Sequence, residues 1–157
     1  MKTLTLLRHA KTERDSPDGD FGRSLTERGR RDAERMGQEI RELGCEFDLV
    51  LASPARRVLE TLAGLGALAP IFDQRIYNAS SRQLLDIIRS ADDAADKLLL
   101  VGHNPGIEEL AAQLAANETE DFPTAALAEI ELPIKHWRDL ADHKGRLVRF
   151  VRPKDLA

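Results

Sequence analysis

The chain has 157 residues, a net charge of −4 and 32% charged residues, which predicts one domain, residues 1–157, with a core of its own. The acidic balance argues against general affinity for nucleic acid, and no apolar run approaches the ~20 residues of a membrane helix. The only cysteine, Cys45, excludes an internal disulfide and is expected to be a small, partly buried residue. Because the amino terminus lacks a secretory-signal pattern, we expect a cytoplasmic protein without a membrane partner.

The first predicted element is a short buried strand at Leu4–Leu7, which ends in Arg8 and His9. Residues 11–22 have no periodicity and are rich in Asp, Ser, Pro and Gly, so they are predicted to form a loop. This loop follows His9 directly and should form one wall of any site there. Arg23, just after the loop, is expected to be a surface arginine rather than a phosphate ligand.

Two helices and a strand are predicted next. Thr26–Leu43 carries an apolar stripe at spacings of three and four, with Thr26 as its cap and Gly44 at its end. Asp48–Ala52 is predicted to be a strand, and Ser53 is expected to cap a helix over Pro54–Leu65. The residues of this helix expected to pack inward are Val58, Leu59, Leu62 and Leu65.

The middle of the chain repeats the alternation of strands and helices. Ile71–Tyr77 is predicted to be a short strand or an extended loop. Ser80 or Ser81 should then cap a helix that runs through Ile88. A further apolar strand is predicted at Lys97–Val101.

The last third begins with His103, directly after that strand. Asn104 is a suitable cap for a helix over Ile107–Ala116. Ala126–Leu132 and Leu147–Val151 alternate as strands do, and they lack a helical crossover between them. They are therefore expected to pair antiparallel at a sheet edge.

This order of elements predicts an α/β fold, a three-layer α/β/α sandwich with a mostly parallel central sheet and an antiparallel edge. Trp137 is expected to be a packing residue over that edge. His136 and His143, in polar surroundings, are expected to be surface histidines.

Three predicted strands deliver cationic or titrating groups at their carboxyl ends. Arg8 and His9 follow the first strand, two arginines follow the second, and His103 follows the third. Ligands of open α/β sheets bind at this edge, and helix amino termini add positive charge there. This convergence predicts an anion site, and phosphate is the anion it fits best.

Five segments resemble the histidine phosphatase superfamily. Residues 7–10, Leu-Arg-His-Ala, are similar to its Arg-His-Gly signature, with alanine in the glycine position. Residues 53–61, Ser-Pro-Ala-Arg-Arg-Val-Leu-Glu-Thr, and residues 101–106, Val-Gly-His-Asn-Pro-Gly, resemble its next two motifs. Residues 20–29 and 122–128 look like the small SixA-like phosphohistidine phosphatase branch. The resemblance implies a phosphoglycerate-mutase-like fold and phosphatase activity.

The resemblance also implies a role for each residue of the site. His9 would attack phosphorus and carry the phosphoryl group. The residues implied to bind phosphate are Arg8, Arg57, His103 and Thr12, and the catalytic set is His9, Arg8, Arg57 and His103. The motif selects Arg57, four positions after Ser53, as the direct ligand, and Arg56 would raise the local positive potential. Because cationic groups surround the phosphate, we expect no metal and no cofactor, and no cluster has the ligand spacing of a metal site.

One departure bears on the substrate. Many relatives with mutase or broad phosphatase activity have a glutamate near residues 75–79 as proton donor, but this segment reads Arg-Ile-Tyr-Asn-Ala. Without that acid, the expected substrate is phosphohistidine, in a protein or as a small phosphoramidate. Glu13, Asp15, Asp18 or Asp20 could replace the acid.

Two alternatives stay open. One is a small-molecule phosphomonoesterase of the same fold, and the other is a catalytically silent phosphate-binding module. The retained histidine nucleophile argues against the silent module. The compact length argues against an esterase, since such relatives usually carry insertions that cap the site. A monomer is expected, acting on a phosphorylated protein or small substrate.

Overall fold

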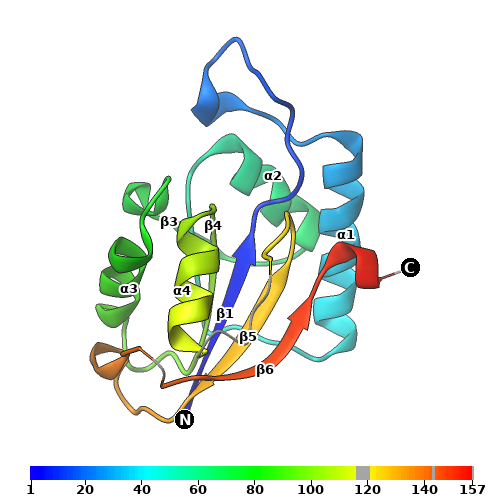
Figure 1. Ribbon diagram of the computed structural model, residues 1–157. Coiled ribbons are helices and arrows are strands. Elements are labelled where there is room, and N and C mark those ends of the chain that lie inside the picture. The colour runs from blue at the N-terminus through cyan, green and yellow to red at the C-terminus, as the bar shows by residue number, and fades with distance from the viewer. Residues whose placement is uncertain (116–120, 143, 157) are drawn as a thin grey trace.

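The computed structural model describes residues 1–115, 121–142 and 144–156. In this part of the chain, six strands form one sheet in the order β3-β2-β4-β1-β5-β6 (Figure 1). The strands are β1 (Lys2–Arg8), β2 (Leu49–Ala52), β3 (Pro70–Phe72), β4 (Lys97–Gly102), β5 (Leu127–Leu132) and β6 (Arg146–Val151). The first four strands are mutually parallel, β5 pairs antiparallel with β1, and β6 pairs antiparallel with β5. The predicted mixed sheet with an antiparallel edge is confirmed.

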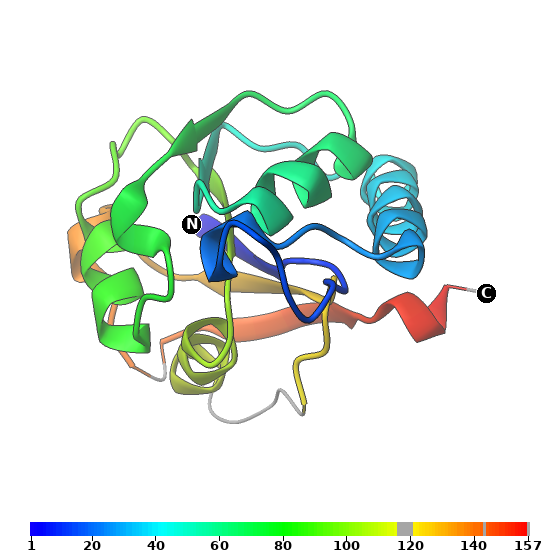
Figure 2. The same ribbon diagram turned by 90° about the horizontal axis from the view of Figure 1, so that it is seen from above.

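Helices cover both faces of this sheet. The helices are α1 (Glu27–Glu42), α2 (Arg56–Leu65), α3 (Ser81–Arg89) and α4 (Gly106–Leu114). α1 and α2 pack together on one side of the sheet, and α3 and α4 pack together on the other (Figure 2). The three-layer α/β/α sandwich is therefore confirmed.

The alternation of side chains along β1 explains why both layers are stable. Leu4 and Leu6 face α3 and α4, whereas Leu7 faces α1 and α2. Because successive strand residues point to opposite faces, a strand that is buried on both sides must be apolar at nearly every position. Trp137 is a buried packing residue, as predicted, but it packs beside α3 and against Lys2 at the start of β1 rather than over the antiparallel edge.

The helix starts predicted from the sequence are confirmed where the side chain of the N-cap residue forms a hydrogen bond with the first turn. The Thr26 hydroxyl accepts the Gly29 backbone N–H at 3.0 Å, and Ser80 forms a capping box with Gln83. Two predicted starts are wrong: α2 begins at Arg56, two residues after the predicted Pro54, and α4 begins at Gly106, one residue before the predicted Ile107, with Pro105 rather than Asn104 as its N-cap. Neither of these two helices has a side-chain hydrogen bond from its N-cap residue.

The structure also tests several smaller predictions about single residues and short segments. Leu59 does not pack inward, because it is 43% exposed on the outer side of α2. The segment after α2 contains the short strand β3 and then a 3₁₀ turn, Gln74–Ile76. Cys45 is half-buried, as expected, and burial raises the pKa of its thiol. His143 and Ala116 lie outside the described residues.

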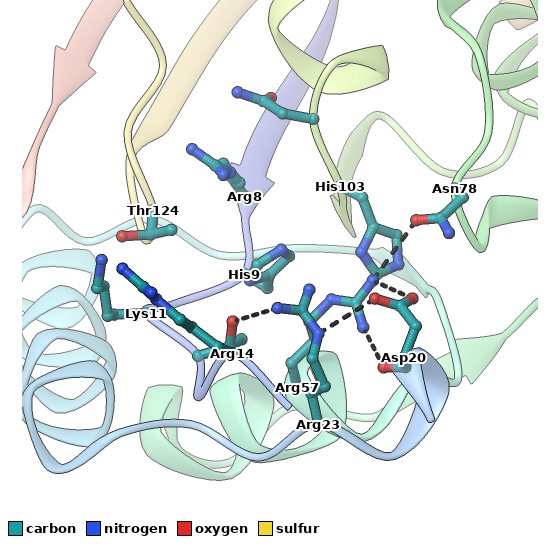
Figure 3. Close-up of a pocket in the computed structure, with 12 residues that line it drawn as sticks. Arg8, His9, Lys11, Arg14, Asp20, Arg23, Arg57, Asn78, His103 and Thr124 are labelled. Carbon is teal, nitrogen blue, oxygen red and sulfur yellow. Dashed lines mark hydrogen bonds and ion pairs between the residues drawn. The ribbon is translucent and has the colours of Figure 1, made fainter. Parts of the chain in front are cut away.

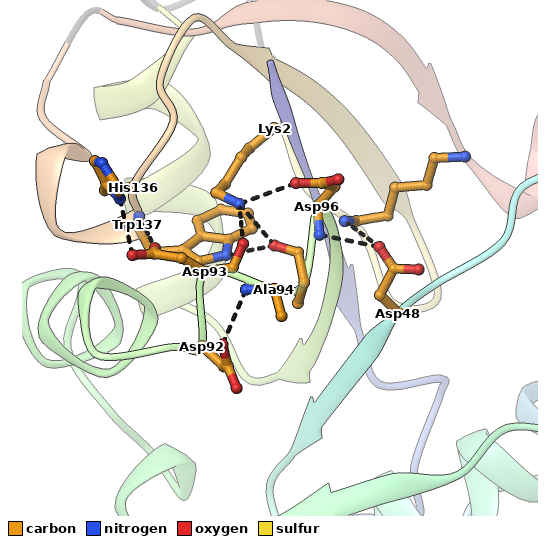
Figure 4. A network of polar contacts seen from close by, with 10 residues as sticks. Lys2, Asp48, Asp92, Asp93, Ala94, Asp96, His136 and Trp137 are labelled. Atoms are coloured by element: carbon orange, nitrogen blue, oxygen red, sulfur yellow. Dashed lines mark hydrogen bonds and ion pairs between the residues drawn. The ribbon is translucent and has the colours of Figure 1, made fainter.

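The end of the sheet at the amino terminus of β1 is closed by a polar network around the buried Lys2 (Figure 4). Its Nζ donates to the carbonyl oxygens of Asp93 and Ala95 at 2.8 and 2.9 Å, and to Asp96 Oδ1 at 3.0 Å. Three donors thus find three acceptors, which removes the cost of burying an unpaired ammonium. His136, partly exposed beside this network, pairs with Asp93.

Candidate functional site

A pocket of about 360 Å³ lies at the opposite end of the sheet, where β1, β2 and β4 reach their carboxyl ends. It is lined by all five side chains that the sequence assigned to a phosphate site, which are Arg8, His9, Thr12, Arg57 and His103. The strand ends that carry them are joined by backbone bonds, since the His9 N–H donates to the Gly102 carbonyl at 3.1 Å. The predicted convergence at this edge is therefore present in the structure.

His9 is held in one tautomer. Its Nδ1–H donates to the Ala10 carbonyl oxygen at 2.8 Å, so the lone pair of the neutral ring lies on Nε2. Burial lowers the pKa of His9 to about 4, and the positive charges of Arg57, Arg8 and Arg23 contribute to this shift. At neutral pH the ring is uncharged, which is the form that can act as a nucleophile.

His103 lies beside His9, with ring centroids 5.3 Å apart. Its Nε2 is hydrogen-bonded to the Ser53 hydroxyl at 2.8 Å, and its Nδ1 is buried without a partner in the described part of the chain. Burial, followed by the charge of Arg57, lowers the pKa of His103 to about 3. Ser53 was predicted to cap α2, and this is wrong, because it precedes the N-cap and holds the second histidine instead.

The two arginines at the start of α2 point in different directions. Arg57 is buried and lines the pocket, where its Nη1 donates to the Asp20 carbonyl at 2.8 Å and its Nη2 to Asp20 Oδ2 at 3.2 Å. Arg56 is exposed, and its Nε donates to Glu60 Oε2 at 2.9 Å. The carboxylate of Glu60 therefore offsets the charge that Arg56 was expected to lend to the site.

Four buried nitrogen atoms of residues that line this pocket have no hydrogen-bond partner in the described residues, and one of them, Arg23 Nε, forms an ion pair with Asp20 Oδ1 at 3.1 Å. The other three have neither kind of partner. They are Arg8 Nε, Arg57 Nε and His103 Nδ1. Buried donors are nearly always satisfied in folded proteins, so an orphaned group calls for an explanation. A tetrahedral oxyanion beside His9 would supply acceptors to all three.

The loop after β1 brings further residues to the pocket, and of these the sequence had singled out only Asp20, as a possible replacement for the missing acid (Figure 3). These residues are Lys11, Arg14, Asp20 and Arg23, and Asn78, Asn104 and Thr124 join them from other segments. Arg23 was expected at the surface, but its Nη1 donates to Thr12 Oγ1 at 3.2 Å in the pocket wall. The signal for Asp20 and Arg23 was present in residues 20–29, which resemble the SixA-like branch.

Asp20 is the only carboxylate among the described residues that line the pocket. It accepts a hydrogen bond from the Tyr77 hydroxyl and forms ion pairs with Arg57 and Arg23. The Tyr77 hydrogen bond is the main cause that lowers the pKa of Asp20, and the two arginines add to it. In this arrangement Asp20 is ionised at neutral pH and is a hydrogen-bond acceptor rather than an acid.

The described residues show neither a metal site nor a membrane-spanning helix. They contain no group of three or more His, Cys, Asp or Glu side chains placed to hold a metal ion. None of their helices has the length and hydropathy of a membrane-spanning segment. Metal independence stays a prediction.

Comparison with known proteins identifies the family. Residues 4–77 match the model of the histidine phosphatase superfamily, branch 1. An uncharacterized protein of Mycobacterium tuberculosis is 34% identical over 161 residues, covering 94% of this chain and all of that protein.

Solved structures agree with this assignment. A protein from Agrobacterium tumefaciens, assigned as a phosphohistidine phosphatase SixA, is 30% identical with a TM-score of 0.79, covering 97% of this chain and 99% of that one. A protein from Nakamurella multipartitia with the same assignment is 27% identical with a TM-score of 0.88, covering 97% and 96% of the two chains. The chain therefore belongs to the histidine phosphatase superfamily, branch 1, among its SixA-like members.

Proposed function

We propose that this protein is a phosphohistidine phosphatase that works through a covalent intermediate on His9. The Nε2 lone pair attacks phosphorus, the substrate P–N bond breaks, and its electron pair leaves with the imidazole, which takes up a proton. Water then attacks the phosphorus, the bond to Nε2 breaks, and phosphate is released. The observation that carries the proposal is the neutral, oriented His9 beside three buried donors without partners.

In this proposal, the buried nitrogen donors around His9 stabilise the negative charge on the transferred phosphoryl group. Phosphoryl transfer depends mainly on positioning and on electrostatic stabilisation of the transferred group. Arg8 and Arg57 would hold the equatorial oxygens with their guanidinium groups, and His103 with its free Nδ1. Thr12, which already accepts a hydrogen bond from Arg23, would bind phosphate at the wall. No metal or other cofactor is part of this proposal.

The choice of leaving group follows from the state of Asp20. An alkyl ester expels an alkoxide, which needs a proton from the enzyme, and an ionised carboxylate has none to give. An imidazole has a pKa near ~6.5 and can leave neutral after protonation close to neutral pH. The site therefore favours phosphorus–nitrogen over phosphorus–oxygen bonds.

A small-molecule phosphomonoesterase is the second candidate, and the position of Asp20 in the pocket is the observation that favours it. If ligand binding freed Asp20 from Tyr77 and Arg57, its carboxyl group could become a proton donor. The two candidates therefore differ in what Asp20 does during turnover.

A direct comparison of substrates tests the proposal. We expect kcat/KM for a phosphohistidine peptide to exceed that for an alkyl phosphate by at least ~10²-fold, the low end of what acid–base assistance contributes. Comparable efficiencies would contradict it. The Asp20→Asn variant serves as the control, because a loss confined to the alkyl ester would identify Asp20 as the missing acid.

The proposal extends to the organisation of the protein. Residues 1–157 form a single histidine phosphatase domain that acts as a cytoplasmic monomer on a phosphorylated protein or small substrate. Nucleic acid and membranes are not partners in this proposal.

A further inference from the structure

The mouth of the pocket carries two cations that the proposed chemistry does not use. Arg8 and Arg57 are assigned to the phosphoryl oxygens, and Arg23 is paired with Asp20 at 3.1 Å. Lys11 and Arg14 also line the pocket, and both are exposed. Neither side chain has an ion pair or a hydrogen bond to another described residue, although acidic residues 13, 15 and 18 are close in sequence. Their charges are therefore available to a ligand.

These two cations lie on a definite side of His9. In Figure 3, Lys11, Arg14 and Thr124 gather on one side of the histidine, opposite Asp20 and His103. The sheet order agrees, because Thr124 precedes β5, and β5 flanks β1 on the side away from β4. The pocket thus has a cationic side next to β5 and an acceptor-bearing side next to β4.

The backbone on the cationic side is well anchored. The Ala125 N–H donates to the carbonyl oxygens of Arg8 and His9, both at 3.0 Å, which fixes the turn that carries Thr124. The Lys11 carbonyl accepts the Thr26 N–H at 2.9 Å, and Thr12 forms a β-bridge with Leu25. Lys11 therefore projects from a fixed segment of chain.

We propose that Lys11 and Arg14 form a second anion-binding subsite, which takes the carboxylate of an acidic residue next to phosphohistidine in a protein substrate. The inference rests on the proposed function and adds to it the chemistry of the flanking sequence. The buried floor around His9 suits a phosphoryl group, which is small and fully enclosed. The exposed cations at the mouth suit a group that stays at the surface of a larger partner. A carboxylate there would also be kept from the β4 side by the negative charge of Asp20.

The test uses two synthetic peptides with a central phosphohistidine, one with Glu on each side and one with Gln on each side. The measurement is the ratio of kcat/KM for the acidic peptide to that for the neutral peptide. We expect about 3- to 10-fold in favour of the acidic peptide, since exposed ion pairs contribute modestly. The ratio should fall below about 2-fold at ~1 M salt, where the Debye length is only ~3 Å.

Matched variants assign the preference to residues. The Lys11→Gln/Arg14→Gln variant should bring the ratio close to one, and a ratio within one enzyme cancels any general loss of activity. Lys135→Gln/Arg138→Gln is the control, because these residues have the same spacing and are exposed. They follow β5 at the far end of the sheet, where Leu132 pairs with Lys2. The control should keep the wild-type ratio.

Four other results would contradict the subsite, and they differ in what they say about the proposed function. Equal efficiencies in the wild-type enzyme, or a preference that survives in Lys11→Gln/Arg14→Gln, would overturn the subsite while leaving the proposed function intact. A preference lost equally in the control would mean a general charge effect and no subsite. If neither peptide is hydrolysed, the proposed function itself fails, and the subsite fails with it.

Discussion

Arg57 and Arg56 are neighbours in α2, yet they meet opposite environments, and this contrast allows a strict test of the site. The side chain of Arg57 is 3% exposed and that of Arg56 is 53% exposed. Arg57 lines the pocket with a partnerless Nε, whereas Arg56 pairs with Glu60 four residues along the helix. Alanine at each position therefore removes the same charge from two different places.

The losses of activity expected for Arg57→Ala and Arg56→Ala differ greatly. Loss of one fixed donor to the transition state costs about 10²–10³-fold in kcat, equivalent to ~2.7–4 kcal/mol. An exposed helical pair such as Arg56 with Glu60 contributes only ~0.3–0.5 kcal/mol, and to stability rather than to rate. Arg57→Lys should lie between these limits, because it keeps the charge but loses the planar fork of donors.

The assay is the rate of phosphoenzyme formation with a phosphohistidine peptide after rapid mixing. Circular dichroism and thermal denaturation of each variant would establish that the fold is kept, and Arg57→Lys covers the case in which Arg57→Ala does not fold. If Arg56→Ala is the slower variant, or if Arg57→Ala stays within ~5-fold of wild type, the assignment of Arg57 is wrong.

Four further predictions concern the neighbouring groups. His9→Ala should abolish turnover and the acid-labile phosphoenzyme, and a labelled intermediate that survives in this variant would refute the mechanism. The pKa values of His9 and His103, about 4 and about 3, lie below the ordinary ~6.5, so the unfolded chain binds protons first as the pH falls. The melting temperature should therefore drop between about pH 6.5 and pH 4, less steeply in a variant with asparagine at both positions. Ser53→Ala leaves His103 Nε2 buried without a partner and should cost ~1–3 kcal/mol in urea unfolding, whereas no loss would exclude that hydrogen bond. Gly29→Ala would place a Cβ 2.1 Å from the Lys11 carbonyl oxygen and should destabilise by ~1–3 kcal/mol, so an unchanged unfolding midpoint would contradict this packing.

The sequence by itself determined the elements whose signal is local. The apolar runs at β1 and β4 are buried on both faces, and Thr26 and Ser80 cap the helices they precede. Such patterns are reliable because burial periodicity and capping depend on residues only a few positions apart. The histidine and arginine motifs also indicated which strand ends would carry the site.

The tertiary structure decided what depends on contacts between distant segments. The hydroxyl of Ser53 had a local use as a helix cap, but it bonds His103, 50 residues away in sequence. Asp20 and Arg23 reach the pocket because the loop after β1 folds back onto the start of α2, where Arg57 binds the Asp20 carbonyl. The position of this loop directly after His9 predicted that it would form a wall of the site, but a loop without periodicity does not indicate which of its side chains will line that wall. Its polar side chains have several partners within reach, and only the packed fold determines which of them are chosen.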